Sequence, residues 1–202
     1  MRRRAAASAE RAQRGQRALP SPGGATCGRC LAEPPRYDAT VAALSYAFPA
    51  DTLVHALKFR GELALAALLG SLLSHEISPE GLSAISFIVP VPLSKKRLRS
   101  RGFNQAVEIA RPIAKAARKP VELTMLERAR DTPAQFDLPW AERRKNVRGA
   151  FAVSGSVLGA TVAVVDDVMT TGATLDEIAG ALKAAGASRV VNWVVARTLP
   201  PQ

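Results

Sequence analysis

Short continuous apolar runs along the chain alternate with longer segments of helical spacing. Runs of strand length occupy residues 41–48, 85–89, 150–153, 161–165 and 189–196. Helical spacing occupies residues 52–59, 62–75, 103–118 and 174–185, with Asp51 as the expected N-cap of the first and Gly186 as the C-cap of the last. Strands that alternate with helices predict an α/β fold, with a mainly parallel central sheet flanked by helices.

Two charged segments do not follow this pattern. Residues 94–102 come directly after Pro90-Val91-Pro92, which cannot continue a central strand, and they are rich in Lys and Arg, so we expect a basic loop. Residues 127–148 are polar, contain two prolines and show no clear period. A segment of this length inside a compact domain is typical of a lid or a binding loop. For residues 95–101 of the basic loop, a solvated surface loop without a binding role is the alternative to a phosphate-binding role.

The front of the chain differs from the rest in composition. Residues 1–26 contain six arginines and a single acid, Glu10, with little to bury, which predicts a disordered basic tail or a non-functional extension. Residues 27–36 begin with Cys27-Gly28-Arg29-Cys30, which is either a redox pair or half of a zinc site. Cys27 and Cys30 supply only two of the four zinc ligands, so a complete zinc site is doubtful. The main domain is expected at residues 37–202.

The net charge indicates the class of binding partner more clearly than the overall composition does. The 202 residues have a net charge of +11, which favours polyanionic partners such as nucleic acid, an anionic membrane or phosphorylated small molecules. No apolar run approaches the ~18 residues that cross a bilayer, so we expect a cytoplasmic protein without a membrane span.

Residues 162–175, VAVVDDVMTTGATL, contain the candidate chemistry. A buried parallel strand would deliver Asp166 and Asp167 to the carboxyl edge of the sheet, outside the core, where α/β proteins bind ligands. The following loop at a helix N-terminus favours a phosphate, and its residues are Thr170, Thr171, Gly172, Ala173 and Thr174. Acids beside a phosphate need another partner, either ribose hydroxyls or Mg²⁺. The alternative is a capped helix after a core strand, with surface acids.

This segment resembles the binding signature for phosphoribosyl pyrophosphate (PRPP) in type I phosphoribosyltransferases. Further segments are similar to the ComF family of competence-associated proteins, namely Val89-Pro90-Val91-Pro92-Leu93, Arg101-Gly102-Phe103-Asn104-Gln105-Ala106 and Arg143-x-x-Asn146-Val147-Arg148-Gly149. The resemblance covers residues 27–198 and implies the type I phosphoribosyltransferase fold preceded by a cysteine-rich zinc module. This chain has one CxxC, whereas the family commonly has two or more such cysteine pairs, and this difference puts the zinc module in doubt.

The resemblance also implies roles for individual residues. Leu93, Ser94, Lys95 and Lys96 would contact pyrophosphate, and Thr170–Thr174 would bind the 5′-phosphate. Asp166 and Asp167 would hold the ribose and the Mg²⁺ that accompanies PRPP. Gln135 and Arg143 would lie over the ligand in a flexible catalytic loop. The implied reaction displaces pyrophosphate from C1 of PRPP, for an acceptor that the sequence does not identify.

Two main functions remain open at this point. The first is a phosphoribosyltransferase. The second is an accessory protein in DNA uptake that binds single-stranded DNA and works with other competence proteins, and the basic tail and residues 95–101 favour it. A PRPP-responsive regulator is a weaker third alternative. The oligomeric state also stays open, with a homodimer among the alternatives.

Overall fold

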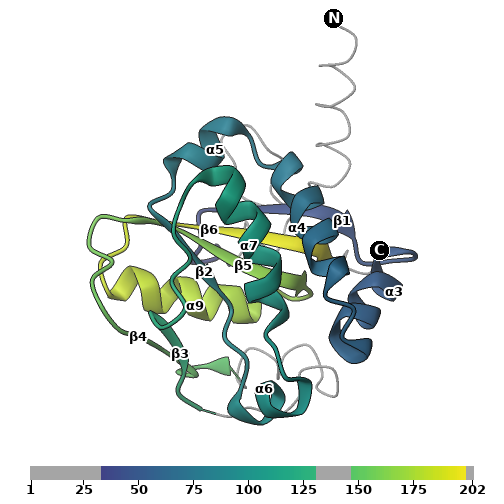
Figure 1. The fold of residues 1–202 in the computed structure, drawn as a ribbon. Helices are drawn as coiled ribbons and strands as arrows, with labels where there is room; N and C mark the ends of the chain where they lie inside the picture. The colour runs from purple at the N-terminus through teal and green to yellow at the C-terminus, as the bar shows by residue number, and fades with distance from the viewer. Residues whose placement is uncertain (1–32, 131–146, 199–202) are drawn as a thin grey trace, which may run out of the picture.

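The computed structural model describes residues 33–130 and 147–198, whose centre is a parallel sheet (Figure 1). Its four strands are β1 (Ala39–Ser45), β2 (Phe87–Pro90), β5 (Thr161–Met169) and β6 (Arg189–Arg197), in the order β1-β6-β5-β2. All three pairings are parallel. The predicted α/β fold with a parallel sheet flanked by helices is therefore confirmed.

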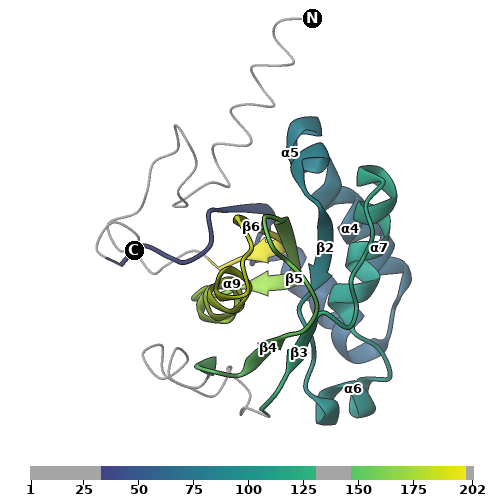
Figure 2. The ribbon, with the colours of Figure 1, turned by 90° about the vertical axis from the view of Figure 1, so that its left-hand side faces the viewer.

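Helices cover both faces of this sheet, as the turned view in Figure 2 shows. Helix α9 (Ala173–Ala184) packs on β6 on one face, and α4 (Ala64–Glu76) and α7 (Gln105–Ala117) pack on the other. The alternation of side chains along β5 feeds both cores. Val162 and Val164 pack with the α9 side, whereas Ala163 and Val165 pack with α4 and α7. Both faces of β5 are thus apolar up to the two acids.

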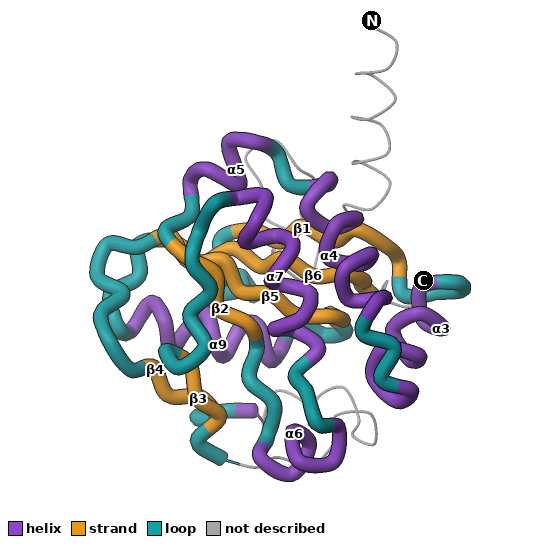
Figure 3. The backbone as a smooth tube through the Cα atoms, in the orientation of Figure 1, coloured by secondary structure: helices purple, strands orange, loops and turns teal. Residues whose placement is uncertain are grey.

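Shorter elements lie around the sheet, with α5 and α6 at opposite sides of the fold (Figure 3). They are α3 (Ala50–His55), the π-helix η1 (Ala56–Arg60), α5 (Pro79–Ala84), α6 (Lys95–Arg101) and the antiparallel pair β3 (Leu126–Arg128) and β4 (Phe151–Val153). Within the described residues, no helix is long and apolar enough to cross a membrane.

The prediction of a basic loop at residues 94–102 was wrong, because most of this segment is helix α6. Ser94 caps the helix by accepting a hydrogen bond from the Arg97 N–H at 3.4 Å. Leu, Lys and Arg have high helix propensity, and Gly102 ends the helix at a φ of +81°. The excess of positive charge in the segment hid this helical signal.

The predicted helix at residues 52–59 divides into α3 and η1. Its N-cap is Pro49, so the prediction of Asp51 as the cap was wrong. Asp51 lies in the first turn instead, where its Oδ1 accepts a hydrogen bond from the Thr52 N–H at 2.7 Å. At the other end of the chain, α9 has Ala185 as its C-cap, one residue before the predicted Gly186.

Strand β5 is longer than the predicted run of residues 161–165. Its pairing with β6 continues through Asp166 opposite Val194 to Met169 opposite Arg197. The two acids are therefore part of the sheet, whereas the sequence pattern placed them directly after the predicted strand 161–165. The predicted division into residues 1–26, 27–36 and 37–202 stays a prediction, since residues 1–32 are outside the described part of the chain.

Candidate functional site

A cavity of about 670 Å³ opens where β2 and β5 end. One wall is continuous in sequence, from Asp166 to Leu175. The opposite wall combines residues 58–61 with parts of residues 91–105, and Arg128 also lines the cavity. Among the described residues, five cations and two acids line this cavity: Lys58, Arg60, Arg97, Arg101 and Arg128, and Asp166 and Asp167. The excess of positive charge suits an anionic ligand.

The loop between β5 and α9 has the geometry of a phosphate-binding turn. Gly172, the N-cap of α9, has a φ of +79°. A Cβ atom there would lie 2.7 Å from Met169 Cε and 3.3 Å from Tyr37 Oη, so the position has little room for a side chain. Thr171 Oγ1 accepts a hydrogen bond from the Ala173 N–H at 3.3 Å. The first residues of this 12-residue helix, Ala173, Thr174 and Leu175, also line the cavity, so the positive end of the helix dipole lies at the cavity.

Two acids in α9 would weaken a phosphate site if they were left unpaired. Asp176 and Glu177 instead form ion pairs with Arg36 at 3.0 Å and 2.6 Å. Glu177 also accepts a hydrogen bond from the Gly149 N–H at 2.8 Å. Burial works against ionisation here, but Arg36 and this N–H outweigh it, and the pKa of Glu177 falls below its ordinary value. The acids therefore fix α9 to the segments around it.

Asp166 and Asp167 have different surroundings although they are adjacent. Asp167 is 3% exposed, forms an ion pair with Lys58 of η1, and accepts a hydrogen bond from Gln105 Nε2 at 3.4 Å. Asp166 is only partly buried, and its Oδ1 accepts a hydrogen bond from the Asp167 N–H at 2.8 Å. Alternation along a strand separates neighbouring side chains, which explains the different partners.

This difference controls the ionisation of the two carboxyls. Burial opposes ionisation of Asp167, but the Lys58 ammonium outweighs it, and the pKa of Asp167 lies below its ordinary value. Burial and the neighbouring Asp167 carboxylate raise the pKa of Asp166 well above its ordinary value. Asp167 is thus a neutralised structural anion, whereas Asp166 is the carboxyl that a hydroxyl or a cation would stabilise. The expectation that both acids lie outside the core was wrong for Asp167.

A chain of polar contacts joins the two walls behind the acids. Arg101 donates a hydrogen bond to Gln105 Oε1, and Gln105 in turn donates to Asp167. Asn104 caps α7 by accepting from the Ala106 N–H at 3.0 Å, and its Nδ2 donates to the Val91 carbonyl at 3.0 Å. The segment from Arg101 to Gln105 therefore ends α6, begins α7 and holds Asp167.

The structure brings some of the predicted site residues together. Asp166, Asp167, Leu93 and all of Thr170, Thr171, Gly172, Ala173 and Thr174 line the same cavity. Ser94 is buried as the cap of α6, while Lys95 and Lys96 are exposed and do not line the cavity. Arg97, Ser100 and Arg101 line it instead, because a helix presents only one face to its neighbour. Gln135, Arg143, Cys27 and Cys30 lie outside the described residues. The roles of all these residues remain predictions.

Sequence reasoning missed Lys58, Gln105 and Arg128 as cavity residues. A lysine between Leu57 and Phe59, in a mostly apolar helical segment, was one available signal for Lys58. Gln105 belongs to the Arg101–Ala106 motif, but nothing in its spacing indicates Asp167 as its partner. Within residues 33–130 and 147–198, no group of three or more His, Cys, Asp or Glu side chains is placed to hold a metal ion.

Comparison with known proteins decides the family. The chain is 37% identical over 177 residues to the DNA utilization protein YhgH of Escherichia coli K12, covering 86% of this chain and 78% of that protein. It belongs to the ComF/YhgH family. Competence protein F of Haemophilus influenzae is another relative, 32% identical over 178 residues that cover 85% of this chain and 78% of that protein. The resemblance to the ComF family is therefore confirmed, although no protein-family model matches the chain.

Solved structures overlap with this ComF/YhgH protein only in part. An allosteric regulatory enzyme of purine biosynthesis matches with a TM-score of 0.43 and 27% identity, over 64% of this chain and 25% of that one. A purine phosphoribosyltransferase from Pyrococcus horikoshii matches with a TM-score of 0.38 and 13% identity, over 81% of this chain and 95% of that one. Overlaps with TM-scores below 0.5 do not identify an activity.

Proposed function

We propose that this ComF/YhgH protein binds PRPP together with Mg²⁺ and transfers its phosphoribosyl group, releasing pyrophosphate. One observation supports the proposal above all others. A single cavity contains a phosphate-binding turn at a helix N-terminus, a half-buried carboxyl and several arginines. These are the groups that a sugar with a phosphate at one end and a pyrophosphate at the other requires.

Each part of PRPP has a matching group in this arrangement. The 5′-phosphate would bind the turn at Thr170–Thr174, and the ribose hydroxyls would donate to Asp166. The pyrophosphate would face Arg97 and Arg101, which line the wall across the cavity. Leu93 also lines that wall, whereas Lys95 and Lys96 would act on the ligand only through their long-range charge.

The donor set fits a Mg²⁺ ion that arrives with its substrate. Mg²⁺ prefers oxygen ligands in an octahedral arrangement and usually combines one or two carboxylates with phosphates and water. Asp167 is already neutralised by Lys58, which leaves Asp166 as the carboxyl for such an ion. The ion would supply positive charge to the leaving pyrophosphate.

Catalysis in this proposal comes from positioning and charge. Loss of pyrophosphate from C1 leaves positive charge on the ribose, and the Asp166 carboxylate would stabilise this charge from beside the ribose. The arginines stabilise the charge on the departing pyrophosphate. Gln135 and Arg143 are proposed to cover the ligand and to exclude water.

The test measures binding and turnover separately on the full chain. We expect millimolar PRPP with Mg²⁺ to raise the melting temperature, because a ligand that binds only the folded state stabilises it. Pyrophosphate release is then followed against a panel of nucleobases and amines. Ribose 5-phosphate is the matched control, since it lacks the pyrophosphate. The absence of any shift with PRPP would reject a working site, and a shift without pyrophosphate release would reject the transferase activity alone.

A second candidate is an accessory role in DNA uptake through binding of single-stranded DNA, with other competence proteins as partners. The exposed cations of α6 favour it, and so do the names of the relatives, "DNA utilization protein" and "Competence protein F". Binding should be independent of sequence and should weaken steeply between low and physiological salt. Deleting residues 1–26 should reduce it. Affinity that is constant with salt would exclude an electrostatic interaction. Both candidate functions would operate in the cytoplasm.

A further inference from the structure

Phe59 is the feature of the cavity that PRPP binding leaves unexplained. Its ring lines the cavity but is 64% exposed. Burial of an aromatic side chain stabilises a fold, so a largely exposed one contributes less to stability than it could. It lies on the same wall as Lys58, in the last turn of η1 and two residues before the C-cap Gly61.

Local structure holds Phe59 at this position. The ring of His55 lies 4.6 Å from the Phe59 ring, centroid to centroid, at an interplanar angle of 41°. Arg101 Cζ lies 5.5 Å from the Phe59 ring centroid, within the range of a cation–π contact. The π-helical turn of η1 buries Lys58 against Asp167 and leaves the next side chain at the mouth of the cavity. Such turns are often found at functional sites.

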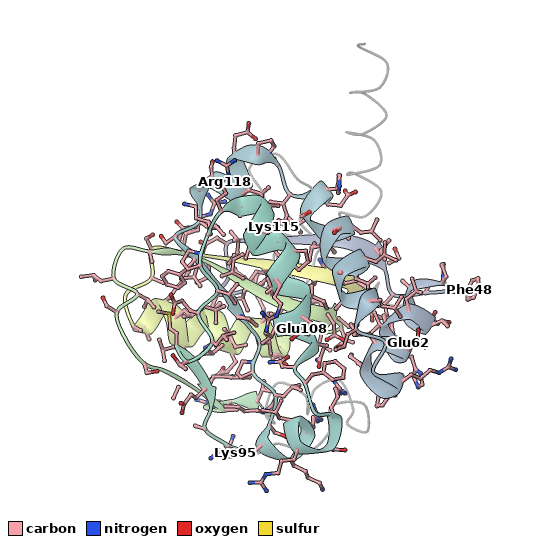
Figure 4. The ribbon with its side chains drawn as sticks, in the orientation of Figure 1. Phe48, Glu62, Lys95, Glu108, Lys115 and Arg118 are labelled. Atoms are coloured by element: carbon pink, nitrogen blue, oxygen red, sulfur yellow. The ribbon has the colours of Figure 1, made fainter. Side chains whose placement is uncertain are left out.

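The charges around Phe59 extend beyond the cavity. Arg97 and Arg101 of α6 line the cavity, whereas Lys95, Lys96 and Arg99 of the same helix are exposed outside it. Figure 4 shows Lys95 pointing away from the fold. Helix α6 contains no acid. A small ligand inside the cavity cannot reach the outer cations, but a longer polyanion that passes the mouth can reach both sets.

We propose that Phe59 is a stacking platform for an unpaired base of a single-stranded nucleic acid, whose phosphates lie along α6. The inference rests on the second candidate function and gives it a site. Nucleic-acid proteins without sequence preference combine a basic surface that follows the backbone with aromatic rings on which bases stack. A free nucleobase could also stack on Phe59, but it has no phosphates to use the exposed cations of α6.

The experiment separates stacking from charge with two fluorescent oligonucleotides of equal length, oligo-dT and an abasic strand. Anisotropy titrations compare the full-length wild type with Phe59→Ala, Phe59→Trp and the control Phe48→Ala. Phe48 is also a highly exposed phenylalanine, 84% exposed, but it does not line the cavity and points away from the fold (Figure 4). All variants keep residues 1–26, so the contribution of that segment cancels.

We expect Phe59→Ala to weaken oligo-dT binding about tenfold, because stacking on an aromatic ring is lost, and to leave abasic-strand binding unchanged. Phe59→Trp should keep or increase the affinity for oligo-dT, and Phe48→Ala should match the wild type. Urea unfolding of each variant shows that the fold is intact. PRPP with Mg²⁺ should still raise the melting temperature of Phe59→Ala.

The remaining outcomes separate this inference from the functions it builds on. Equal affinity of wild type and Phe59→Ala for oligo-dT overturns the stacking site while the second candidate function stands. An equal loss for both strands also overturns it, since charge or folding then explains the effect. If free thymine or adenine displaces oligo-dT at concentrations similar to that of the strand, Phe59 binds a small acceptor base and the stacking site for a strand is overturned. If the wild type binds neither strand, the second candidate function fails too, whatever the result with PRPP.

Discussion

The two walls of the cavity are built in opposite ways. The wall from Asp166 to Leu175 is one unbroken stretch that ends β5, turns at Gly172 and begins α9. The wall across from it combines η1 with parts of α6 and α7. The helix η1 lies about 40 residues before α6 and α7 in the sequence. Local geometry is sufficient for the first wall, and packing of distant elements is necessary for the second.

This contrast suggests a division of labour between the walls. The continuous wall offers main-chain N–H groups and hydroxyls, which suit the phosphate common to many ligands. The assembled wall offers Lys58, Phe59 and the arginines, whose identity determines what else the cavity accepts. The contact between Lys58 and Asp167 joins the walls, so changes at this pair should have the largest effects.

Removing the cation that joins the walls tests this point directly. Lys58→Met leaves the Asp167 carboxylate buried without its partner, which typically costs about 3–5 kcal/mol of unfolding free energy. Urea unfolding at pH 7 measures the loss. Lys115→Met, at an exposed position on α7, is the control and should change little. Adding Asp167→Asn to Lys58→Met should recover part of the loss, and a double variant no more stable than Lys58→Met would show that the charge is not the cause.

A smaller effect, on ligand affinity, is expected from Asp166→Asn. Loss of a charged hydrogen-bond partner for the ribose should weaken PRPP binding by roughly ten- to a hundred-fold, or about 1.5–3 kcal/mol. Sulfate, which has no ribose, should bind the variant as well as the wild type or slightly better. Isothermal titration with both ligands makes the comparison, and an equal loss of sulfate binding would assign Asp166 to the phosphate-binding turn or to the fold.

Two glycines, one on each wall, allow a matched comparison of backbone strain. Gly172 has a φ of +79° and Gly61 a φ of +69°, but only at Gly172 would a Cβ meet other atoms within 4 Å. Either residue replaced by Ala should lose about 1–2 kcal/mol of stability because of the left-handed backbone. Only Gly172→Ala should also weaken sulfate and PRPP binding. Similar losses of sulfate affinity in both variants would contradict the assignment of phosphate to the continuous wall.

The smallest effect concerns pH, and it follows from the raised pKa of Asp166. Between the ordinary carboxyl pKa of the unfolded chain and the raised value in the fold, the folded state binds more protons. Stability contributed by Asp166 is therefore greatest below this window and falls as the pH rises through it. Asp167, with its lowered pKa, has the opposite sign and loses its contribution as the pH falls. Urea unfolding measured from pH 4 upward should show that the free energy of unfolding declines less steeply with pH in Asp166→Asn than in the wild type.

Much of the fold and of the continuous wall was predictable because the signals are local. Alternation of strands and helices indicated a parallel sheet, and the acids followed by Thr170–Thr174 indicated an anion site. The errors were also local. Residues 94–102 resembled a loop because of their charge, yet Ser94 and Gly102 cap a helix. Because a helix turns only one of its faces toward the cavity, Arg97 and Arg101 line it, whereas the predicted Lys95 and Lys96 do not.

The sequence by itself determined that a strand, two acids and a glycine turn meet at the start of a helix, since these residues are consecutive and their geometry follows from backbone rules. Only the tertiary structure decided that Lys58 and Gln105 meet Asp167, and that Phe59 stays exposed beside Arg101. No spacing rule relates residues that far apart. Their contacts result from the packing of η1 and α7 around β5, which buries one acid with its cation and leaves the other for a ligand.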